Sequence, residues 1–293
     1  MKRLPKILAI CLLALPAGRS ATAAGPERAA VLRAEVSFLC DSLCAGRGLG
    51  SAGAQRGTTY LLRQLRDAGL RTTVQSFTAA GRTGHNVVAV TPGWFRRYIV
   101  VGAYADALGT LGGRVYPGAD ANASGIAALL ALARELPAAC RGEVGLVFVA
   151  FDGHEADLAG ASAFLERFRA LYPPVLMVNL DQLGSSLAPV RKSRPDYLIA
   201  LGAEPFRAAL EAANRGPALD LSYDYYGSRS FTELFYRRVS DQRWFLEAGI
   251  PAVMFTSGIT QHTNKTSDTP ATLDYTLLDR RITLIATWLR SRL

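Results

Sequence analysis

The stretch FDGHEADLAG, Phe151 to Gly160, places Asp152, His154 and Glu155 within four residues of one another. It follows an apolar run, residues 145–150, that predicts a buried strand. Imidazole and carboxylate groups are the usual general acids and bases of enzymes, and they are also ligands for zinc and for harder cations. The stretch is therefore either a working catalytic site or what remains of one.

Further acids and imidazoles follow other expected strands, namely Asp106, Asp120, Asp181, His262 and Asp268. In a mostly parallel sheet the carboxyl ends of the strands lie along one edge, where ligands bind. We therefore expect Asp106, Asp120, Glu155, Asp181 and His262 to share one cleft at that edge. Each acid taken alone could instead cap a helix or face solvent.

The order of apolar patterns predicts the elements that hold these residues. Helices are expected at residues 26–44, 54–69, 126–136, 159–171, 204–214, 241–247 and 277–290. Strands are expected at residues 72–77, 86–91, 97–104, 143–151, 175–180, 197–201 and 251–256. This alternation predicts a single α/β domain over residues 25–293, with a central mixed, mostly parallel sheet of about eight strands covered on both faces.

Residues 1–24 have the pattern of a secretory signal peptide, with a basic start, an apolar stretch from Ile7 to Ala17 and the small residues Ala21 and Ala23 before a cleavage point. The apolar stretch is shorter than the roughly 18 residues of a membrane span. We expect a protein with no membrane span after cleavage, located in the periplasm or secreted. Both locations, and the oligomeric state, stay open.

Loss of that segment removes four basic residues and no acids, which lowers the formal net charge from +9 to +5. The basic pairs Arg96-Arg97 and Arg237-Arg238 lack interleaved stacking aromatics, so nucleic-acid binding is not expected. Three cysteines stay, Cys40, Cys44 and Cys140, and their odd number excludes complete internal pairing. Cys40 and Cys44, one helical turn apart, could form a strained disulfide or half a metal site, but we interpret them as buried thiols.

The order of several longer motifs carries a family resemblance. These are NVVAV, IVVGAYAD, PGADANASGIAALLALAREL, VFVAFDGHEADLAGASAF, NLDQLG, SDQRWFLEAGIPAVMF and TNKTSDTPATLDY. In this order they resemble the di-zinc aminopeptidases typified by aminopeptidase Y and the bacterial leucyl aminopeptidases, with glutaminyl cyclases and the transferrin-receptor ectodomain as relatives. The resemblance covers nearly all of residues 25–293 and implies a zinc-exopeptidase-like fold.

The resemblance implies five zinc ligands and a glutamate base, and this sequence departs from most of them. Tyr104 stands where the family has its first histidine ligand, Ala121 at the bridging aspartate, and Asn264 at the last histidine. His154 occupies the position of the base. Glu155 and Asp181 are the two ligand positions that keep their residue type, and Asp106, Asp120 and Asp268 are expected around the pocket.

Without a bridging carboxylate, two dications about 3.5 Å apart repel by on the order of 20 kcal/mol even at an effective dielectric constant of 20. We therefore interpret FDGHEADLAG as a degraded di-zinc site. The function expected is that of an exported, non-catalytic binding protein or pseudoenzyme. A small peptide or an amino acid is its suggested ligand, by analogy with the fold. A buried Tyr104 is expected to donate its hydroxyl to Asp181, Glu155 or Asp106.

Two alternatives remain open. A single zinc ion held by Glu155, Asp181, His262 and either His154 or Asp120 would make the protein an active metal-dependent peptide hydrolase, with His154 also available as a base. A metal-free serine hydrolase finds less support, because the sequence lacks a G-x-S-x-G elbow.

Overall fold

The computed structural model describes residues 25–293, so the expected signal peptide lies outside the described residues. The helices are α1 (Pro26–Leu39), α2 (Ala52–Asp67), α3 (Gly125–Glu135), α4 (Ala159–Phe168), α5 (Arg207–Ala213), α6 (Arg229–Arg237), α7 (Gln242–Glu247) and α8 (Tyr275–Arg290). The strands are β1 (Arg71–Ala79), β2 (Arg82–Val90), β3 (Arg97–Tyr104), β4 (Gly109–Leu111), β5 (Arg114–Tyr116), β6 (Val144–Phe151), β7 (Pro174–Leu180), β8 (Tyr197–Leu201), β9 (Asp220–Ser222) and β10 (Ala252–Thr256). In this part of the chain no helix is long and apolar enough to cross a lipid bilayer.

Eight strands form one mixed sheet in the order β1-β2-β6-β3-β7-β10-β8-β9. Its four central strands, β6, β3, β7 and β10, run parallel to one another. β2 and β8 flank them in the antiparallel direction. The predicted fold class, a mixed and mostly parallel sheet in one α/β domain, is confirmed.

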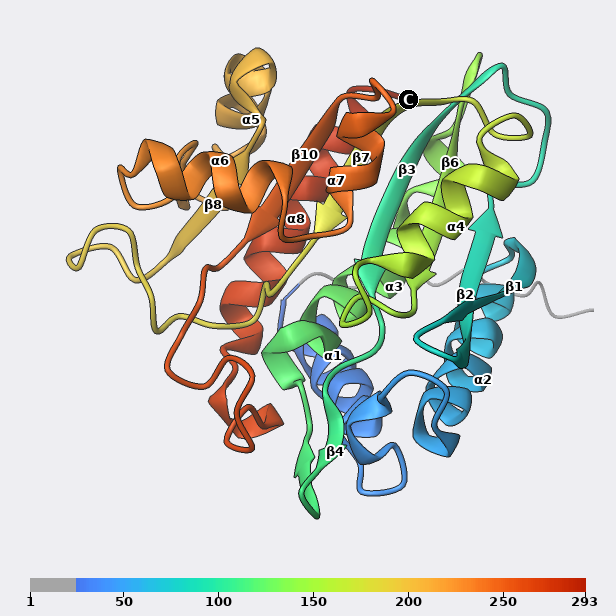
Figure 1. Cartoon of the computed structure of the whole chain (residues 1–293). Helices are drawn as coiled ribbons and strands as arrows, with labels where there is room; N and C mark the ends of the chain where they lie inside the picture. The colour runs from blue at the N-terminus through green and yellow to red at the C-terminus, as the bar shows by residue number, and fades with distance from the viewer. Residues whose placement is uncertain (1–24) are drawn as a thin grey trace, which may run out of the picture.

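The sheet is buried on both faces, and strand β6 shows how the sequence achieves this. Its residues alternate between the two sides because successive side chains of a strand point in opposite directions. Leu146 and Phe148 pack into the core shared with α1, α2, α3 and α8. Val147 and Phe151 pack into a second core shared with α4 and α7. Figure 1 shows the resulting layers, with α4 and α7 in front of the sheet and α1, α3 and α8 behind it.

The structure contains a hairpin, β4–β5, and a helix, α6, that were not predicted from the sequence. The glycine-rich segment after β3, expected as a loop, contains the β4–β5 hairpin, in which Gly112 and Gly113 take positive φ angles of 56° and 74°. A two-residue hairpin turn with positive φ at both positions favours glycine, so the glycines mark a turn between strands. Helix α6 was missed, and none of its residues is buried. All three cysteines of the described chain are free thiols.

A buried arginine, Arg47, fastens the segments on either side of the site. Its guanidinium donates to the carbonyl oxygens of Leu39, Ala105, Pro117 and Gly118, and the side chain is 2% exposed. Ala105 follows β3, while Gly118 precedes the loop that contains Asp120. One planar cation therefore fixes the positions of two loops and the end of α1 at once.

We predict that Arg47→Met lowers the free energy of unfolding by about 3 kcal/mol or more, because several buried carbonyl groups lose their donor at about 1–3 kcal/mol each. Urea denaturation monitored by circular dichroism measures this change. Arg63→Met is the control, since Arg63 is exposed and pairs loosely with Asp67 at 3.7 Å. The fastening role is refuted if both variants change stability by less than about 0.5 kcal/mol, the usual range for surface substitutions.

Candidate functional site

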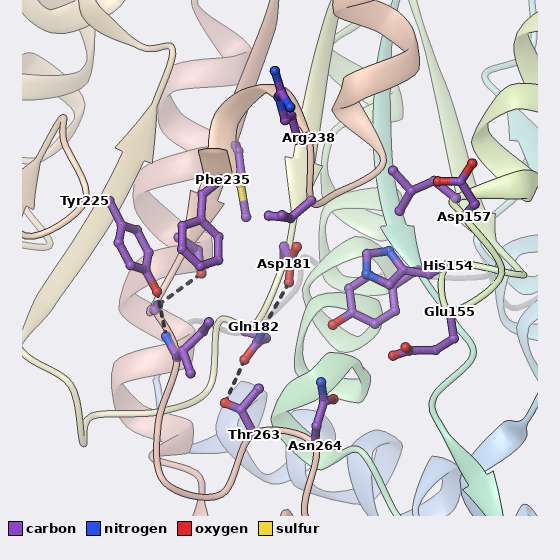
Figure 2. Close-up of a pocket in the computed structure, with 17 residues that line it drawn as sticks. His154, Glu155, Asp157, Asp181, Gln182, Tyr225, Phe235, Arg238, Thr263 and Asn264 are labelled. Carbon is purple, nitrogen blue, oxygen red and sulfur yellow. Dashed lines mark hydrogen bonds between the residues drawn. The ribbon is translucent and has the colours of Figure 1, made fainter. Parts of the chain in front are cut away.

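A cavity of about 380 Å³ lies at the carboxyl ends of the four central parallel strands. Tyr104 ends β3, Glu155 follows β6, Asp181 follows β7, and Thr256 ends β10. The lining residues are Tyr104, His154, Glu155, Asp157, Leu158, Asp181, Gln182, Tyr225, Phe235, Arg238, Val239, Met254, Thr256, Gly258, Ile259, Thr263 and Asn264 (Figure 2). The topology thus delivers side chains from distant parts of the sequence to one edge of the sheet.

Asp106 holds the loop that carries the acidic wall of the cavity. Its carboxylate oxygens accept the backbone N–H groups of His154, at 3.0 Å, and of Glu155, at 3.2 Å. Burial raises the pKa of Asp106 to about 7, with a contribution from neighbouring Asp152. Asp106 does not line the cavity, so its observed contacts are those of a buried loop anchor.

His154, in the cavity wall, pairs with a buried carboxylate. Its Nδ1 lies 3.0 Å from Oδ2 of Asp241, a carboxylate that is fully buried. Burial by itself would lower the pKa of His154, but Asp241, Asp181 and Asp106 together raise it to about 9. The Asp241 carboxylate beside Nδ1 therefore favours the protonated, cationic form of the imidazole.

Tyr104 packs flat against this imidazolium. The two ring centroids are 3.7 Å apart and the planes are inclined by 15°. The expected hydrogen bond from the Tyr104 hydroxyl to Asp181, Glu155 or Asp106 is not formed. The expectation failed because it treated the hydroxyl as the group that needs a partner, whereas the ring finds a cationic partner in His154.

Asp120 and Asp268 clamp the loop that contains Ala121. The two carboxylate oxygens of Asp268 accept the N–H groups of Asp120, at 2.8 Å, and of Ala121, at 3.0 Å. Asp120 in turn accepts from the N–H of Gly184 and from the hydroxyl of Ser124. Neither acid lines the main cavity, and burial raises the pKa of Asp120 to about 7.

The last candidates divide between two places. Asn264 lines the cavity and also a small adjoining void that it shares with Ala121 and Asp268. His262 lies outside the cavity lining, and its Nδ1 is 2.9 Å from the Ser267 hydroxyl. Of the five residues expected in one cleft, the structure brings Glu155 and Asp181 to the cavity wall, while Asp106 and Asp120 lie behind it.

The opposite wall of the cavity is apolar and was not foreseen. Tyr225 stacks on Phe235 with ring centroids 4.1 Å apart, and its hydroxyl accepts the backbone N–H of Ile259. Figure 2 shows these two aromatic side chains on the side of Asp181 away from His154 and Glu155. The aromatic run around YDYYG was a usable sequence signal, but it has no residue type that points to catalysis.

The sequence pattern of Peptidase family M28 matches residues 86–289, more than half of the chain. The chain belongs to peptidase family M28. The alkaline phosphatase isozyme conversion protein of Escherichia coli (strain K12) is 28% identical over 213 residues, which cover 61% of this chain. The match covers 60% of that protein, so this chain spans less than two thirds of its length.

Solved structures show the same fold as this M28 chain. The zinc aminopeptidase BSAP of Bacillus subtilis superposes with a TM-score of 0.71 at 14% identity, covering 90% of this chain and 94% of its own. The glutaminyl cyclase of Porphyromonas gingivalis gives 0.70 at 17% identity, with coverage of 90% and 98%. The LapA aminopeptidase of Legionella pneumophila gives 0.70 at 16% identity, with coverage of 89% and 73%. At these identities the likeness establishes the fold.

Zinc is the metal to consider for this M28 chain, because the zinc aminopeptidase BSAP has the same fold. The donor set here does not fit a zinc pair. Ala121 offers a methyl group where a bridging carboxylate is needed. Within residues 25–293 no three His, Cys, Asp or Glu side chains form a group that could hold a metal ion. Glu155 and Asp181 supply two carboxylates, fewer than the three protein ligands of a typical catalytic zinc.

We predict that Asp241→Asn lowers the free energy of unfolding by about 2–3 kcal/mol at pH 7, because it leaves the largely buried His154 cation without its partner. Chemical denaturation measures the loss, and Asp157→Asn, at an exposed carboxylate on the cavity rim, is the matched control. In the His154→Gln background the same Asp241→Asn change should cost much less, as a double-mutant cycle requires for a coupled pair. Equal costs in the two backgrounds would show that the pair is not coupled.

Tyr104→Phe should change the free energy of unfolding by less than about 0.5 kcal/mol, since the hydroxyl has no hydrogen-bond partner within residues 25–293 and the ring stack is kept. Tyr104→Leu removes the stacked ring and should cost more than Tyr104→Phe. Thermal and urea unfolding of the two variants measure the difference. A loss of about 1–2 kcal/mol in Tyr104→Phe would instead indicate that the hydroxyl does form the hydrogen bond expected from the sequence.

Proposed function

We propose that this M28 protein is an exported binding protein that recognises the free amino group of a short peptide or amino acid, and that it is not a zinc aminopeptidase. The observation that carries the proposal is the wall formed by Glu155 and Asp181 in a cavity whose donor set does not fit a zinc pair. Export is supported by the signal-peptide pattern of residues 1–24.

The charge of the cavity favours an ammonium group. Asp181 is 4% exposed, and burial raises the pKa of its carboxyl while the neighbouring His154 cation opposes that shift. The Gln182 amide Nε2 lies 3.4 Å from Oδ1 of Asp181, and hydrogen bonding from the Ser240 side chain also counteracts the rise of its pKa. An ammonium carries three donors and one positive charge, so it supplies what the two carboxylates lack.

The apolar wall favours a ligand with an apolar side chain next to that amino group. Tyr225 and Phe235 lie opposite the acidic loop (Figure 2), and Met254 and Ile259 line the same cavity. Aromatic and apolar walls with a few fixed polar groups are typical of small-molecule sites, whose volumes are roughly 300–1,000 Å³. The cavity therefore suits an amino-terminal leucine-like residue.

The state of the base position argues against hydrolysis. A general base must accept a proton near the operating pH. The imidazole of His154 is held by Asp241, which favours its protonated form, and the Tyr104 ring covers one of its faces. His154 thus contributes a fixed positive charge to the wall.

Titration calorimetry with leucyl-alanine, N-acetyl-leucyl-alanine and leucinamide tests the proposal. We expect leucyl-alanine and leucinamide to bind, and N-acetylation, which removes the ammonium charge, to weaken binding at least about tenfold. Asp181→Asn should cause a similar loss for leucyl-alanine. Asp67→Asn, on the exposed face of α2, is the matched control and should bind like the unmodified protein.

The competing proposal, a single-zinc hydrolase, predicts the opposite results for the same purified protein. It requires about one zinc per chain by elemental analysis and hydrolysis of leucyl-anilide that a chelator abolishes. It also requires loss of that rate in both Asp181→Ala and His262→Ala. A chelator-sensitive kcat of even roughly 1 per second, low for an enzyme, with this pattern would overturn the binding-protein proposal.

A further inference from the structure

Arg238 stands between the cavity and a second hollow on the same side of the molecule. It follows the last residue of α6 and lines the cavity together with Phe235 and Val239. It also lines a groove of about 480 Å³ formed with Arg237, Arg243, Leu246 and Glu247. The two hollows therefore share Arg238 as a common wall.

Arg238 differs from the two other arginines of this groove in having no acidic partner. Arg237 donates to Glu233 at 2.6 Å, and Arg243 donates to Asp157 and Glu247 at 2.9 and 3.0 Å. The guanidinium of Arg238 forms no ion pair or hydrogen bond with any residue in the described part of the chain. Its planar fork of N–H donors is free to bind an anion.

We propose that Arg238 binds a carboxylate of the ligand, so that the protein recognises short peptides by a positive and a negative group at once. The inference rests on the proposed function, because it takes the amino group to lie at Glu155 and Asp181. The guanidinium geometry matches a carboxylate, with two parallel N–H donors for its two oxygens.

The arrangement of charge also fixes the direction of the ligand. Figure 2 shows Arg238 at the rim on the far side of Asp181 from Asn264, with its guanidinium directed outward. A carboxylate placed at the acidic wall would be repelled by Glu155 and Asp181, and an ammonium placed at the rim would be repelled by Arg238. The ligand therefore enters with its amino end inward, and its chain passes the apolar side chains of Phe235 and Val239.

Two sources of that carboxylate are chemically equivalent at Arg238, the carboxyl terminus of a dipeptide and an acidic side chain. Leucyl-alanine, leucyl-alanine amide and leucyl-glutamate amide distinguish them in titration calorimetry. Leucyl-alanine amide should bind at least about tenfold more weakly than leucyl-alanine. Recovery of affinity by leucyl-glutamate amide assigns the site to acidic side chains as well, and no recovery assigns it to the carboxyl terminus.

Arg238→Gln should weaken leucyl-alanine binding to the level of its amide and leave the affinity for the amide unchanged. Arg237→Gln is the matched control, because Arg237 is the adjacent, exposed and already paired arginine, and it should keep the full preference for the free acid. Both residues are exposed, so both variants should unfold at the same midpoint as the unmodified protein.

The inference is overturned if the unmodified protein binds leucyl-alanine and its amide equally, or if Arg238→Gln keeps the preference for the free acid. Either result leaves the proposed function standing as long as N-acetylation still weakens binding at least about tenfold. Failure of every probe to bind, or equal binding of the N-acetylated peptide, would instead remove the proposed function and this inference with it.

Discussion

The constraint on which the site depends is the neutralisation of buried carboxylates at one edge of the sheet. Backbone N–H groups donate hydrogen bonds to the carboxylates of Asp106, Asp120 and Asp268, and each of these acids thereby fixes a loop. The carboxylate of Asp241 is paired with the imidazole of His154. Buried Asp181 and exposed Glu155 line the cavity, and the proposal that the cavity binds a cation rests on these two carboxylates.

Membership of family M28 is compatible with a donor set that does not fit a zinc pair, because the sheet and the cavity wall are built largely from different residues. The cores on both faces of the sheet contain Leu146, Phe148, Val147 and Phe151, and none of these four residues lines the cavity. The cavity wall is built from loop residues at the strand ends. The loops can change residue type while the sheet and its helices stay the same.

The sequence predicted the sheet well because its strands are apolar on both faces and end at polar residues. Strand β3 and strand β8 have the predicted bounds, and the carboxyl ends of β3, β6 and β7 bring Tyr104, Glu155 and Asp181 together as expected. The partners of these residues could not be predicted. Asp241 reaches His154 from 87 positions away, and no local pattern encodes that contact. Tyr225 and Arg238 flank α6, a helix without buried residues that was missed although its apolar residues have helical spacing.

The clamp made by Asp268 has a consequence for how the site comes into being. It binds the N–H groups of Asp120 and Ala121 from almost 150 positions later in the chain. Arg47, Ser124 and Gly184 also hold this loop, but its full set of hydrogen bonds needs residue 268. A chain that lacks its last segment would therefore keep most of the central sheet and lose part of the support of the loop around Ala121.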